Sequence, residues 1–469
     1  MTQLPPLRAS RYLNVIKLDN EKCLLFNGIN ACMDEVPCWL GEKLSSSGIL
    51  DGLSPDALEL LRRRGHVTAL SPGEELSRFR ELALALHDRS MAHLGKPSVM
   101  LLLSYNCNLA CKYCYQHEHR PGKSSALITP QALDSFVERN LGELFPGHNC
   151  ANWSFYGGEP FLPANLPTIR RALEYSSRWG THAKAISNCT RVHEMPEIFG
   201  RGPGKVGWVQ VSLDGDRAEH DSSRVPASGE PTFDRIIANI SLLAELGVQV
   251  SIRLNLDRRK APGMLRLLQY LKEKKITSSP NVSVYAAALH DNIAEVDSSD
   301  FMDVSELAAR VFELGIDLEH PLSMRANDMS KLMGSDKAVG LNKTFFCMQT
   351  PQRSVVLDPF GDVYACFEEA GYPQYRIARA TPQGTEFFAM REKYCSKHVA
   401  NMPDCLQCTV ALACGGQCGV TNRRKTGDPL KPDCADIRRV ILESLKLAYK
   451  KRGETPAIPA AVSDVSLHG

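Results

Sequence analysis

The sequence has no long apolar run, no export signal and almost no excess of charge of either sign. No stretch approaches the roughly 18 apolar residues of a membrane-spanning helix. The first residues, Met1-Thr2-Gln3-Leu4-Pro5-Pro6, lack the basic-then-apolar pattern of a signal peptide. Lys and Arg total 55 against 53 Asp and Glu, a net charge of +2, so no bulk field recruits nucleic acid or anionic lipid. We therefore expect a cytoplasmic protein that binds neither nucleic acid nor membrane.

The 469 residues leave room for roughly two to four domains. The apolar share of 43% and the charged share of 23% are typical of a globular protein. A chain of this length buries a core without crosslinks, so its 16 cysteines need another explanation. In a reducing compartment, thiols at fixed short spacings are more often metal or cluster ligands than disulfides.

Ten of the cysteines fall into three groups with short spacings. The first group is C-x3-C-x2-C, the second is a pair with Gly361 between its members, and the third is a run of four followed by one more. In chain order they are Cys107, Cys111 and Cys114; Cys347 and Cys366; and Cys405, Cys408, Cys414, Cys418 and Cys434. We interpret the others as small buried hydrophobic residues: Cys23, Cys32, Cys38, Cys150, Cys189 and Cys395.

Between residues 96 and 325, short β-rich runs alternate with helical segments. The runs are 99–104, 151–156, 183–187, 206–213, 248–254 and 282–287, and the amphipathic segments between them include 130–144, 233–246 and 264–274. Six such units predict an α/β fold with a parallel sheet and helices outside, a partial (β/α)6 TIM-like barrel or an open sheet. Ligands bind at the C-terminal ends of such strands, and Cys107 begins just after the first run.

Two further parts and a tail flank this barrel. Residues 1–95 contain strand-like runs at 12–16 and 23–26 and helical patterns from Ser54-Pro55 to Gly65 and over 74–94, which indicates a small β+α module. Residues 338–450 are rich in cysteine, glycine and turns and end in a helix-like segment at 437–449, which predicts a domain organised by what its thiolates bind. Residues 453–469 have the composition of a disordered tail.

Three cysteines on one short loop suit an incompletely ligated metal cluster. A [4Fe–4S] cube normally takes four cysteine ligands, so a loop that offers three leaves one iron open. An electron delivered by such a cluster to a bound sulfonium can cleave a sulfur–carbon bond homolytically. Spacing alone also allows half of a zinc site, although zinc favours paired C-x2-C units and four ligands.

The loop Cys107-Asn108-Leu109-Ala110-Cys111-Lys112-Tyr113-Cys114-Tyr115 resembles the signature loop of radical S-adenosylmethionine (SAM) enzymes. Four further motifs resemble that family in place and order: Gly157-Gly158-Glu159-Pro160, Ser187-Asn188-Cys189-Thr190, Ser212-Leu213-Asp214-Gly215 and Arg253-Leu254-Asn255. Cys189 stands where the family usually has glycine. Together the motifs span about 150 residues, from Cys107 to Asn255.

The resemblance implies a [4Fe–4S] cluster on Cys107, Cys111 and Cys114 that binds SAM. Its SAM-site residues would be Tyr113, Gly157, Gly158, Glu159, Ser212 and Asn255. Each has a plainer explanation when taken alone. The glycines could form only a tight turn, Glu159 could be a helix-start carboxylate, and Ser212 and Asn255 could be ordinary turn formers at strand ends.

The C-terminal cysteines resemble the SPASM extension of radical SAM enzymes, with Gly361 at the expected turn. The resemblance implies two auxiliary [4Fe–4S] clusters: Cys347, Cys366 and Cys418 would hold the first, and Cys405, Cys408, Cys414 and Cys434 the second. The first is then one ligand short. Either Cys395 completes it, or it keeps an open iron, and the sequence leaves both possibilities open. Four of these cysteines could alternatively form a zinc ribbon.

The resemblance implies reductive cleavage of SAM to a 5′-deoxyadenosyl radical, with flavodoxin or ferredoxin as the reductant. The N-terminal module resembles that of enzymes that modify ribosomally made peptides, in which it can pair with a leader peptide as an added strand; a structural cap is the alternative. We therefore expect an oxidoreductase that matures a precursor peptide by crosslinking or oxidation. The alternatives are an anaerobic sulfatase-maturing, formylglycine-generating enzyme and, in another class, a non-catalytic iron–sulfur carrier or scaffold.

Overall fold

The computed structural model describes residues 6–46, 50–93, 95–116, 125–226, 229–258, 261–288, 342–347 and 350–452, together with 302, 306–307 and 310–311. The chain forms two compact units. The larger comprises Leu94–Pro321 and Met348–Ser396, and the smaller comprises Met1–His93, Leu322–Cys347 and Lys397–Gly469. Among the described helices, none has the length and apolar character needed to cross a membrane. The expected tail, 453–469, lies outside the described residues.

The larger unit is built on the parallel sheet that the sequence predicts. Its first six strands are β6 (Ser98–Leu102), β7 (Asn152–Tyr156), β8 (Ala183–Ser187), β9 (Val206–Leu213), β10 (Gln249–Leu256) and β11 (Val282–Ala288). They lie side by side in chain order, and each neighbouring pair is parallel. All six predicted runs are therefore strands, and the partial-barrel prediction is confirmed.

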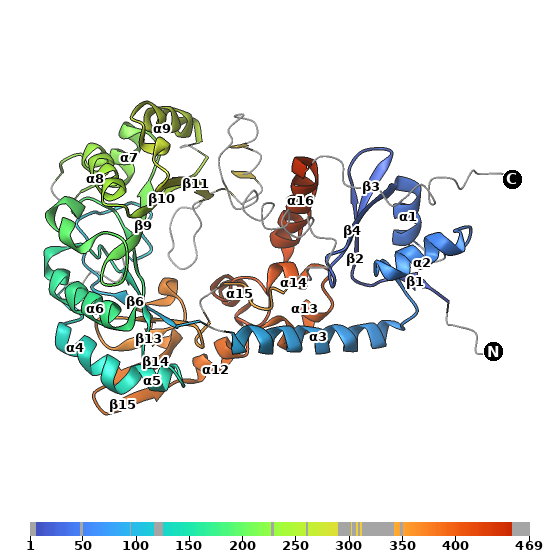
Figure 1. The fold of residues 1–469 in the computed structure, drawn as a ribbon, viewed down its shortest axis with the longest axis horizontal. Helices are drawn as coiled ribbons and strands as arrows, with labels where there is room; N and C mark the ends of the chain where they lie inside the picture. Colours follow the sequence, from blue (N-terminus) through green and yellow to red (C-terminus); the bar gives the residue numbers. More distant parts are fainter. Residues whose placement is uncertain are drawn as a thin grey trace. The chain divides into compact units, whose positions relative to one another are not determined.

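Helices cover the outer face of this sheet (Figure 1). They are α4 (Pro130–Ser135), a π-helical turn (Phe136–Asn140), α5 (Leu141–Leu144), α6 (Leu166–Trp179), α7 (Arg217–Ser223), α8 (Phe233–Glu245) and α9 (Ala261–Glu273). Strand β9 shows the division between faces: Val209, Val211 and Leu213 are buried in the core under the helices, whereas Gln210 and Ser212 alternate with them on the inner face.

Four strands that the sequence analysis did not anticipate extend the sheet beyond β6. They are β12 (Ser354–Leu357), β13 (Asp362–Tyr364), β14 (Arg376–Thr381) and β15 (Gly384–Phe387), followed by α12 (Ala389–Cys395). Strand β12 is parallel to β6, and the next three pair antiparallel, which gives a ten-stranded sheet. Figure 1 shows these strands beside β6 and α5. The region expected as one domain, 338–450, is thus shared between the two units.

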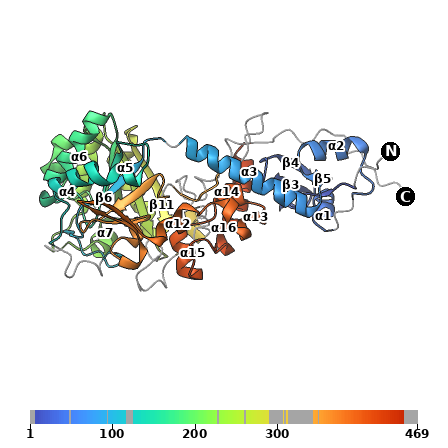
Figure 2. The same cartoon turned by 90° about the horizontal axis from the view of Figure 1, so that it is seen from below.

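The smaller unit contains an antiparallel sheet of β2 (Leu13–Lys17), β3 (Lys22–Asn27) and β4 (Met33–Pro37), and a short pair of β1 (Arg8–Ala9) with β5 (Val67–Thr68). Its helices include α1 (Cys38–Ser46), α2 (Pro55–Arg63) and α3 (Pro72–Ala92). Helix α3 starts two residues before the predicted segment because Ser71 caps it and forms a capping box with Glu74. Figure 2 shows α3 as one long helix.

The C-terminal part of the smaller unit consists of short helices and one long one: α13 (Pro403–Leu406), α14 (Ala411–Cys414), α15 (Gly419–Thr426) and α16 (Ala435–Arg452). Both faces of the small sheet are covered. Leu24 and Phe26 pack with this part and with α3, while Cys23 and Leu25 pack with α1 and α2. The predicted N-terminal module therefore shares a core with the cysteine-rich segment.

Candidate active site

The first cysteine group lies on the loop that follows β6, at the C-terminal end of the sheet. Cys111 is buried, and Cys107 and Cys114 are half-buried. The segment after α7 holds the loop, because the backbone nitrogens of Ala110 and Lys112 donate to the carbonyls of Val225 and Ser223 at 2.7 and 3.3 Å. The chain thus places all three thiols where ligands bind in parallel α/β folds.

The surroundings of Cys107 suit a negatively charged sulfur. Its Sγ accepts from the backbone nitrogen of Leu109 at 3.4 Å and from Nδ2 of Asn188 at 3.8 Å. As it stands, no group of three or more His, Cys, Asp or Glu side chains in the described ranges has the geometry to hold a metal ion. The donor set still fits an iron–sulfur cluster: three cysteines on one loop with N–H groups directed at a sulfur.

Gly157 and Gly158, predicted as SAM-site residues, let the end of β7 approach the cysteine loop. A Cβ atom on Gly158 would lie 1.9 Å from the carbonyl oxygen of Asn106, and one on Gly157 would lie 2.4 Å from that of Ser104. Gly157 also has φ of +133°. The backbone nitrogen of Glu159 completes the approach by donating to the Asn106 carbonyl at 2.8 Å. The observed role of the pair is therefore close backbone packing beneath Cys107.

Glu159 is enclosed by donors from two strand ends. Its carboxylate accepts from Ser187 Oγ at 2.7 Å, from the nitrogen of Asn188 at 2.7 Å and from the nitrogen of Phe161 at 3.0 Å. The residue is only 1% exposed. Burial raises the pKa of its carboxyl group, and these hydrogen bonds oppose that rise. Glu159 therefore joins β7 to β8 beside the loop.

The turn after β8 supplies polar contacts to the loop that the motif alone did not reveal. Asn188 Nδ2 donates to Asn108 Oδ1 at 2.9 Å, and Asn108 Nδ2 donates to Thr190 Oγ1 at 2.8 Å. Cys189 has φ of +62°, which is the left-handed conformation that favours glycine, and it is fully buried. This explains why the resembling family has glycine there. The thiol of Cys189 serves packing, as predicted.

Tyr113 belongs to a second polar network on the other side of the loop. Its hydroxyl donates to Asp214 Oδ2 at 2.5 Å and accepts from Arg224 Nη1 at 2.7 Å. Asn255 Nδ2 donates to the other oxygen of Asp214 at 3.1 Å. Burial and the neighbouring Asp214 raise the pKa of the Tyr113 hydroxyl, and Arg224 opposes the rise. Asp214, which the sequence analysis did not select, is the fully buried centre of this network.

Ser212 lies on the inner face of β9, in register with Arg253 of β10. Arg253 makes a side-chain hydrogen bond to Tyr285 of β11. Tyr113, Ser212 and Asn255 thus lie at the C-terminal end of the sheet with the cysteine loop, as the resemblance implies. Their contacts to SAM stay a prediction.

An aromatic cluster joins the loop to the residue after Cys366 within the larger unit. Tyr115 and Tyr156 share a hydrogen bond through their hydroxyl groups. Phe367 lies 5.1 Å from the Tyr156 ring and 6.4 Å from the Tyr115 ring, measured between centroids. These side chains fill the inner side of the sheet near the predicted site.

The third cysteine group gathers in the smaller unit. Burial raises the pKa of Cys405, and three neighbouring thiols, Cys414, Cys434 and Cys408, raise it further. Burial and Cys408 and Cys414 likewise raise the pKa of Cys434 to about 11. Thiols whose ionisation is hindered by their neighbours need a positively charged partner to become thiolates together, and an iron cluster or a zinc ion supplies one. This donor set is the one predicted for the second auxiliary cluster.

The predicted ligands of the first auxiliary cluster come from both units. Cys366 follows β13 in the larger unit, whereas Cys347 and Cys418 belong to the smaller one. Burial lowers the pKa of the Lys397 ammonium, and the nearby Cys347 and Cys418 oppose this effect. The ammonium donates to the carbonyls of Gly416 and Gln417 at 3.0 and 2.5 Å. The grouping of these three cysteines and the part played by Cys395 stay predictions.

Comparison with known proteins agrees with this geometry. Residues 101–258 match the model of the radical SAM superfamily. The chain is 26% identical over 195 residues to a cysteine-type anaerobic sulfatase-maturating enzyme of Clostridium novyi (strain NT), a match that covers 40% of the chain and only about half (49%) of that relative. It is 19% identical over 470 residues to the radical SAM cyclopropyl synthase TigE of Paramaledivibacter caminithermalis (strain DSM 15212 / CIP 107654 / DViRD3), covering 94% of the chain and 95% of TigE.

Among solved structures, native anSMEcpe with bound AdoMet and the Cp18Cys peptide is similar in fold. Its TM-score is 0.52 at 17% identity, over 79% of this chain and 99% of that chain. The matched family region contains the cysteine loop and both polar networks that position it. Residues 101–258 thus match the radical SAM superfamily, and the chain is similar to the anaerobic sulfatase-maturating enzymes.

Proposed function

We propose that this enzyme modifies a peptide by hydrogen-atom abstraction, leading to a crosslink or another oxidation. The observation that carries the proposal is the loop of Cys107, Cys111 and Cys114, fixed by the Glu159 and Asp214 networks at the C-terminal end of the sheet. The full-length similarity to TigE, a cyclopropyl synthase, supports an activity beyond SAM cleavage alone.

When bound to the loop, the cluster and SAM supply a 5′-deoxyadenosyl radical that removes a hydrogen atom from the substrate. The chain's own residues orient and enclose the site. Glu159 and Asn188 fix the loop from one side, and Tyr113 with Asp214 fixes it from the other. We assign SAM contacts to Tyr113, Gly157, Gly158, Glu159, Ser212 and Asn255.

We also propose two auxiliary [4Fe–4S] clusters, with the ligands assigned from the sequence. The effect of neighbouring thiols, Cys414 among them, on the pKa values of Cys405, Cys408 and Cys434 supports the second cluster. The first cluster rests on the family resemblance. Held by these cysteines, the clusters would supply an acceptor for the electron released as the product forms. Flavodoxin or ferredoxin would supply the reducing electron, and the enzyme would work in the cytoplasm.

The N-terminal module supports a role in binding the peptide's leader. The edge of its sheet at β2 is covered, because Asn14 Nδ2 donates to the Thr409 carbonyl at 3.1 Å and Tyr12 donates to the Leu406 carbonyl at 2.7 Å. Among the described strands, β4 pairs only with β3, and Arg64 Nη2 donates to the carbonyl of its first residue, Met33, at 2.9 Å. A leader peptide would therefore add to β4 as a fourth strand.

A sulfatase-maturating activity is the second candidate, because the first matched relatives carry that name. The resemblance to that family implies an aspartate directly after the second SPASM cysteine, where this chain has Phe367. Its near neighbour Glu369 is fully buried and accepts from the Tyr394 hydroxyl at 2.8 Å. Glu369 thus makes a structural contact, and Phe367 stands where the resemblance implies the aspartate, which favours the first candidate.

The test is anaerobic incubation of the reconstituted enzyme with dithionite, SAM and the peptide encoded beside its gene. We expect 5′-deoxyadenosine and a peptide that has lost two hydrogens by mass. Alanine at Cys107, Cys111 and Cys114 should abolish both, whereas Cys150→Ala should retain them. If the protein makes no 5′-deoxyadenosine, it is an electron carrier or scaffold. Conversion of a sulfatase peptide to formylglycine would instead favour the second candidate.

A further inference from the structure

A cavity of about 790 Å³ opens at the N-terminal ends of the strands in the larger unit, opposite the end that carries the cysteine loop. Its lining includes the first residues of several strands: Ser98 of β6, Asn152 of β7, Ala183 of β8, Gln249 of β10 and Ser354 of β12. On β8, Lys184 lies four residues before Asn188, which puts the cavity about 13 Å along the strand from the loop's polar network.

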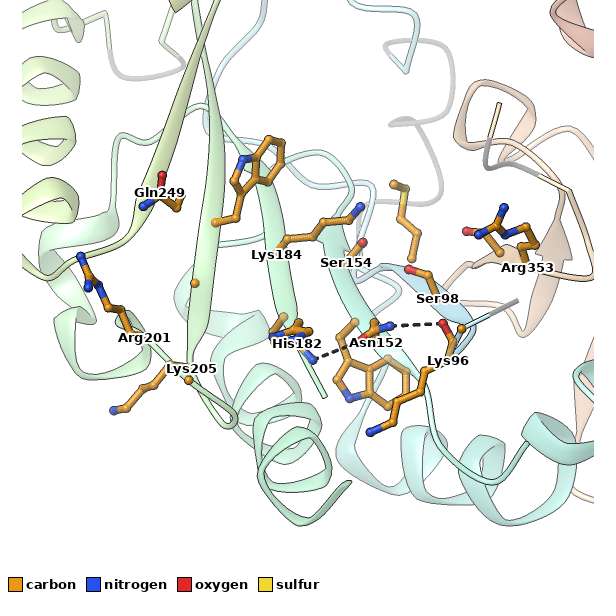
Figure 3. Close-up of a pocket in the computed structure, with 18 of the residues that line it drawn as sticks. Lys96, Ser98, Asn152, Ser154, His182, Lys184, Arg201, Lys205, Gln249 and Arg353 are labelled. Atoms are coloured by element: carbon orange, nitrogen blue, oxygen red, sulfur yellow. Dashed lines mark hydrogen bonds between the residues drawn. The ribbon is translucent and has the colours of Figure 1, made fainter. Parts of the chain in front are cut away.

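The inner wall is a row of side chains in register across five strands. Ser154 pairs with Met100 on one side and with Lys184 on the other, and Lys184 pairs in turn with Trp208. Gln249 continues the row on β10. Figure 3 shows Lys184 and Ser154 beside each other in this wall. The row combines one ammonium group, hydrogen-bonding groups and an aromatic surface.

Positive charge is concentrated in this cavity, although the whole chain is nearly neutral. None of the lining residues in the described part of the chain is Asp or Glu, and the cationic ones are Lys96, Lys184, Arg201, Lys205 and Arg353. Figure 3 shows Arg201 and Lys205 on one side, Arg353 on the other and Lys184 between them, as the strand order requires. A low-dielectric cavity lined by one sign of charge attracts ligands of the opposite sign.

Three of these cations are held in place by backbone carbonyls. Lys96 donates to Trp179 O at 2.8 Å, Arg201 donates to Gly247 O at 3.2 Å, and Lys205 donates to Glu197 O. These carbonyl contacts fix the positions of the three side chains and do not themselves neutralise charge. The charge of Lys205 is partly compensated by the nearby Glu197 carboxylate. Positive charge at the rim is therefore preorganised and still available to an anion.

Lys184 is the central cation. It is open to the solvent of the cavity, yet the surrounding protein lowers the pKa of its ammonium group through burial alone. A carboxylate placed beside it would restore the charged form and recover the desolvation cost. A bound anion thus has a specific partner in the wall of the cavity.

The spread of the charges distinguishes between kinds of anion. A phosphate site gathers its donors around one point, whereas here the cations lie on both sides of the cavity around Lys184. Trp208 and Met100 add apolar surface in the same wall. We propose that the cavity binds an acidic segment of a peptide, with Lys184 paired to one of its carboxylates. This deepens the proposed function and rests on it, because the segment would belong to the substrate.

The test measures binding directly, with no need for SAM cleavage. Anaerobically reconstituted enzyme is titrated against a fluorescein-labelled peptide of alternating glutamate and glycine, and anisotropy is recorded. We expect saturable binding that weakens as salt rises from about 50 to about 500 mM. The same peptide with glutamine in place of glutamate should bind at least tenfold more weakly.

Substitutions at Lys184 identify the site. Lys184→Met keeps the length of the side chain without its charge and should weaken binding at least tenfold, whereas Lys184→Arg should stay within threefold of the wild type. Lys274→Met is the matched control, because Lys274 is exposed beside Tyr270 and outside the cavity, and it should change nothing.

Two results would overturn the inference. One is an unchanged affinity of Lys184→Met for the peptide. The other is displacement of the peptide by inorganic phosphate at the same concentration of negative charge, which would make the cavity a phosphate site. A failure of the proposed function can be distinguished from a failure of this inference. Peptide binding without 5′-deoxyadenosine would reject the enzyme activity alone, and peptide modification without acidic-peptide binding would reject only this cavity's role.

Discussion

The carboxylate of Glu159 accepts a 2.7 Å hydrogen bond from the backbone nitrogen of Asn188, and this contact ties the end of β7 to the end of β8. Asn188 continues the connection through its side chain to Asn108 in the cysteine loop at 2.9 Å. The position of the loop therefore depends on two strand ends as well as on its own sequence. Substitutions outside the cysteines should affect the cluster through this connection.

Gly158→Ala tests the close packing beneath the loop. The added methyl group would lie 1.9 Å from the Asn106 carbonyl oxygen, which belongs to the backbone directly before Cys107. Because neither backbone can retreat cheaply, the loop must shift. We expect a lower iron content after reconstitution and a fall of about 100-fold in 5′-deoxyadenosine formation, measured by chromatography.

Gly73→Ala is the matched control. Gly73 lies in the first turn of α3, and a Cβ atom there meets nothing within 4 Å. Alanine should raise the free energy of unfolding by about 0.5–1 kcal/mol and leave activity unchanged. Full activity in Gly158→Ala would show that the close approach does not position the loop.

Tyr113→Phe removes the hydroxyl group that bridges Asp214 and Arg224. The change leaves a buried carboxylate with one donor fewer, which costs about 1–3 kcal/mol. The aromatic ring remains, so we expect iron content to persist while SAM affinity falls, as measured by equilibrium binding. Tyr175→Phe, which removes a 2.7 Å bond to the partly exposed Asp134, should leave SAM affinity unchanged. A loss of iron with unchanged SAM affinity would assign the phenol to the loop instead.

The six strands of the barrel were predictable because each is a short β-rich run followed by a helical pattern. The extension by β12 to β15 was not. Strand β12 pairs with β6, which lies about 250 residues earlier in the chain, and no local pattern encodes such a pairing. The β4 strand and α1 were also missed, because Met33–Pro37 contains two acids and a proline, which are weak strand signals.

The site shows the same limit. The motifs located the cysteine loop and its SAM-site candidates, because each follows a predicted strand. The partners that hold these residues could not be predicted. Asp214 accepts hydrogen bonds from Tyr113 and Asn255, which lie about 100 and 40 residues away in the sequence. Only the fold brings such side chains together.

Cys189→Gly should be nearly neutral, since two effects oppose each other. Glycine relieves the left-handed conformation at φ of +62°, worth about 1 kcal/mol, and forfeits a similar amount from the buried side chain. We expect a change within about 1 kcal/mol in the free energy of unfolding, with activity kept. Cys189→Val should cost about 1–3 kcal/mol, because a β-branched residue tolerates this backbone least. Equal stability of the two variants would contradict the argument.

The stability of the smaller unit should fall below neutral pH through His398. Burial lowers the pKa of His398 from 6.5 to about 4, and the stacked ring of His87, 3.8 Å away, adds to the effect. The unfolded chain therefore binds more protons than the folded one between these values, so stability is lost as pH falls below 6.5. We expect a loss of about 1.5 kcal/mol between pH 6.5 and 5, measured by urea unfolding.

His398→Phe keeps the stack on His87 and removes the more strongly shifted group. Because burial also lowers the pKa of His87, the variant should reduce this pH dependence without abolishing it. His93→Gln is the control, because His93 is exposed at the end of α3. An unchanged slope in His398→Phe would place the acid sensitivity elsewhere.

Cys408→Ala tests the second auxiliary cluster. Burial and neighbouring thiols, Cys414 among them, raise the pKa values of Cys408, Cys405 and Cys434. Removing one thiol therefore deprives the remaining three of a complete ligand set. We expect about four iron atoms fewer per chain, with the cluster of the Cys107 loop retained. The half-buried Cys32 is the matched control in the same unit, and Cys32→Ala should keep all the iron. If Cys408→Ala instead lost zinc and kept its iron, the four thiols would form a zinc ribbon, and the electron released from the substrate would need another acceptor.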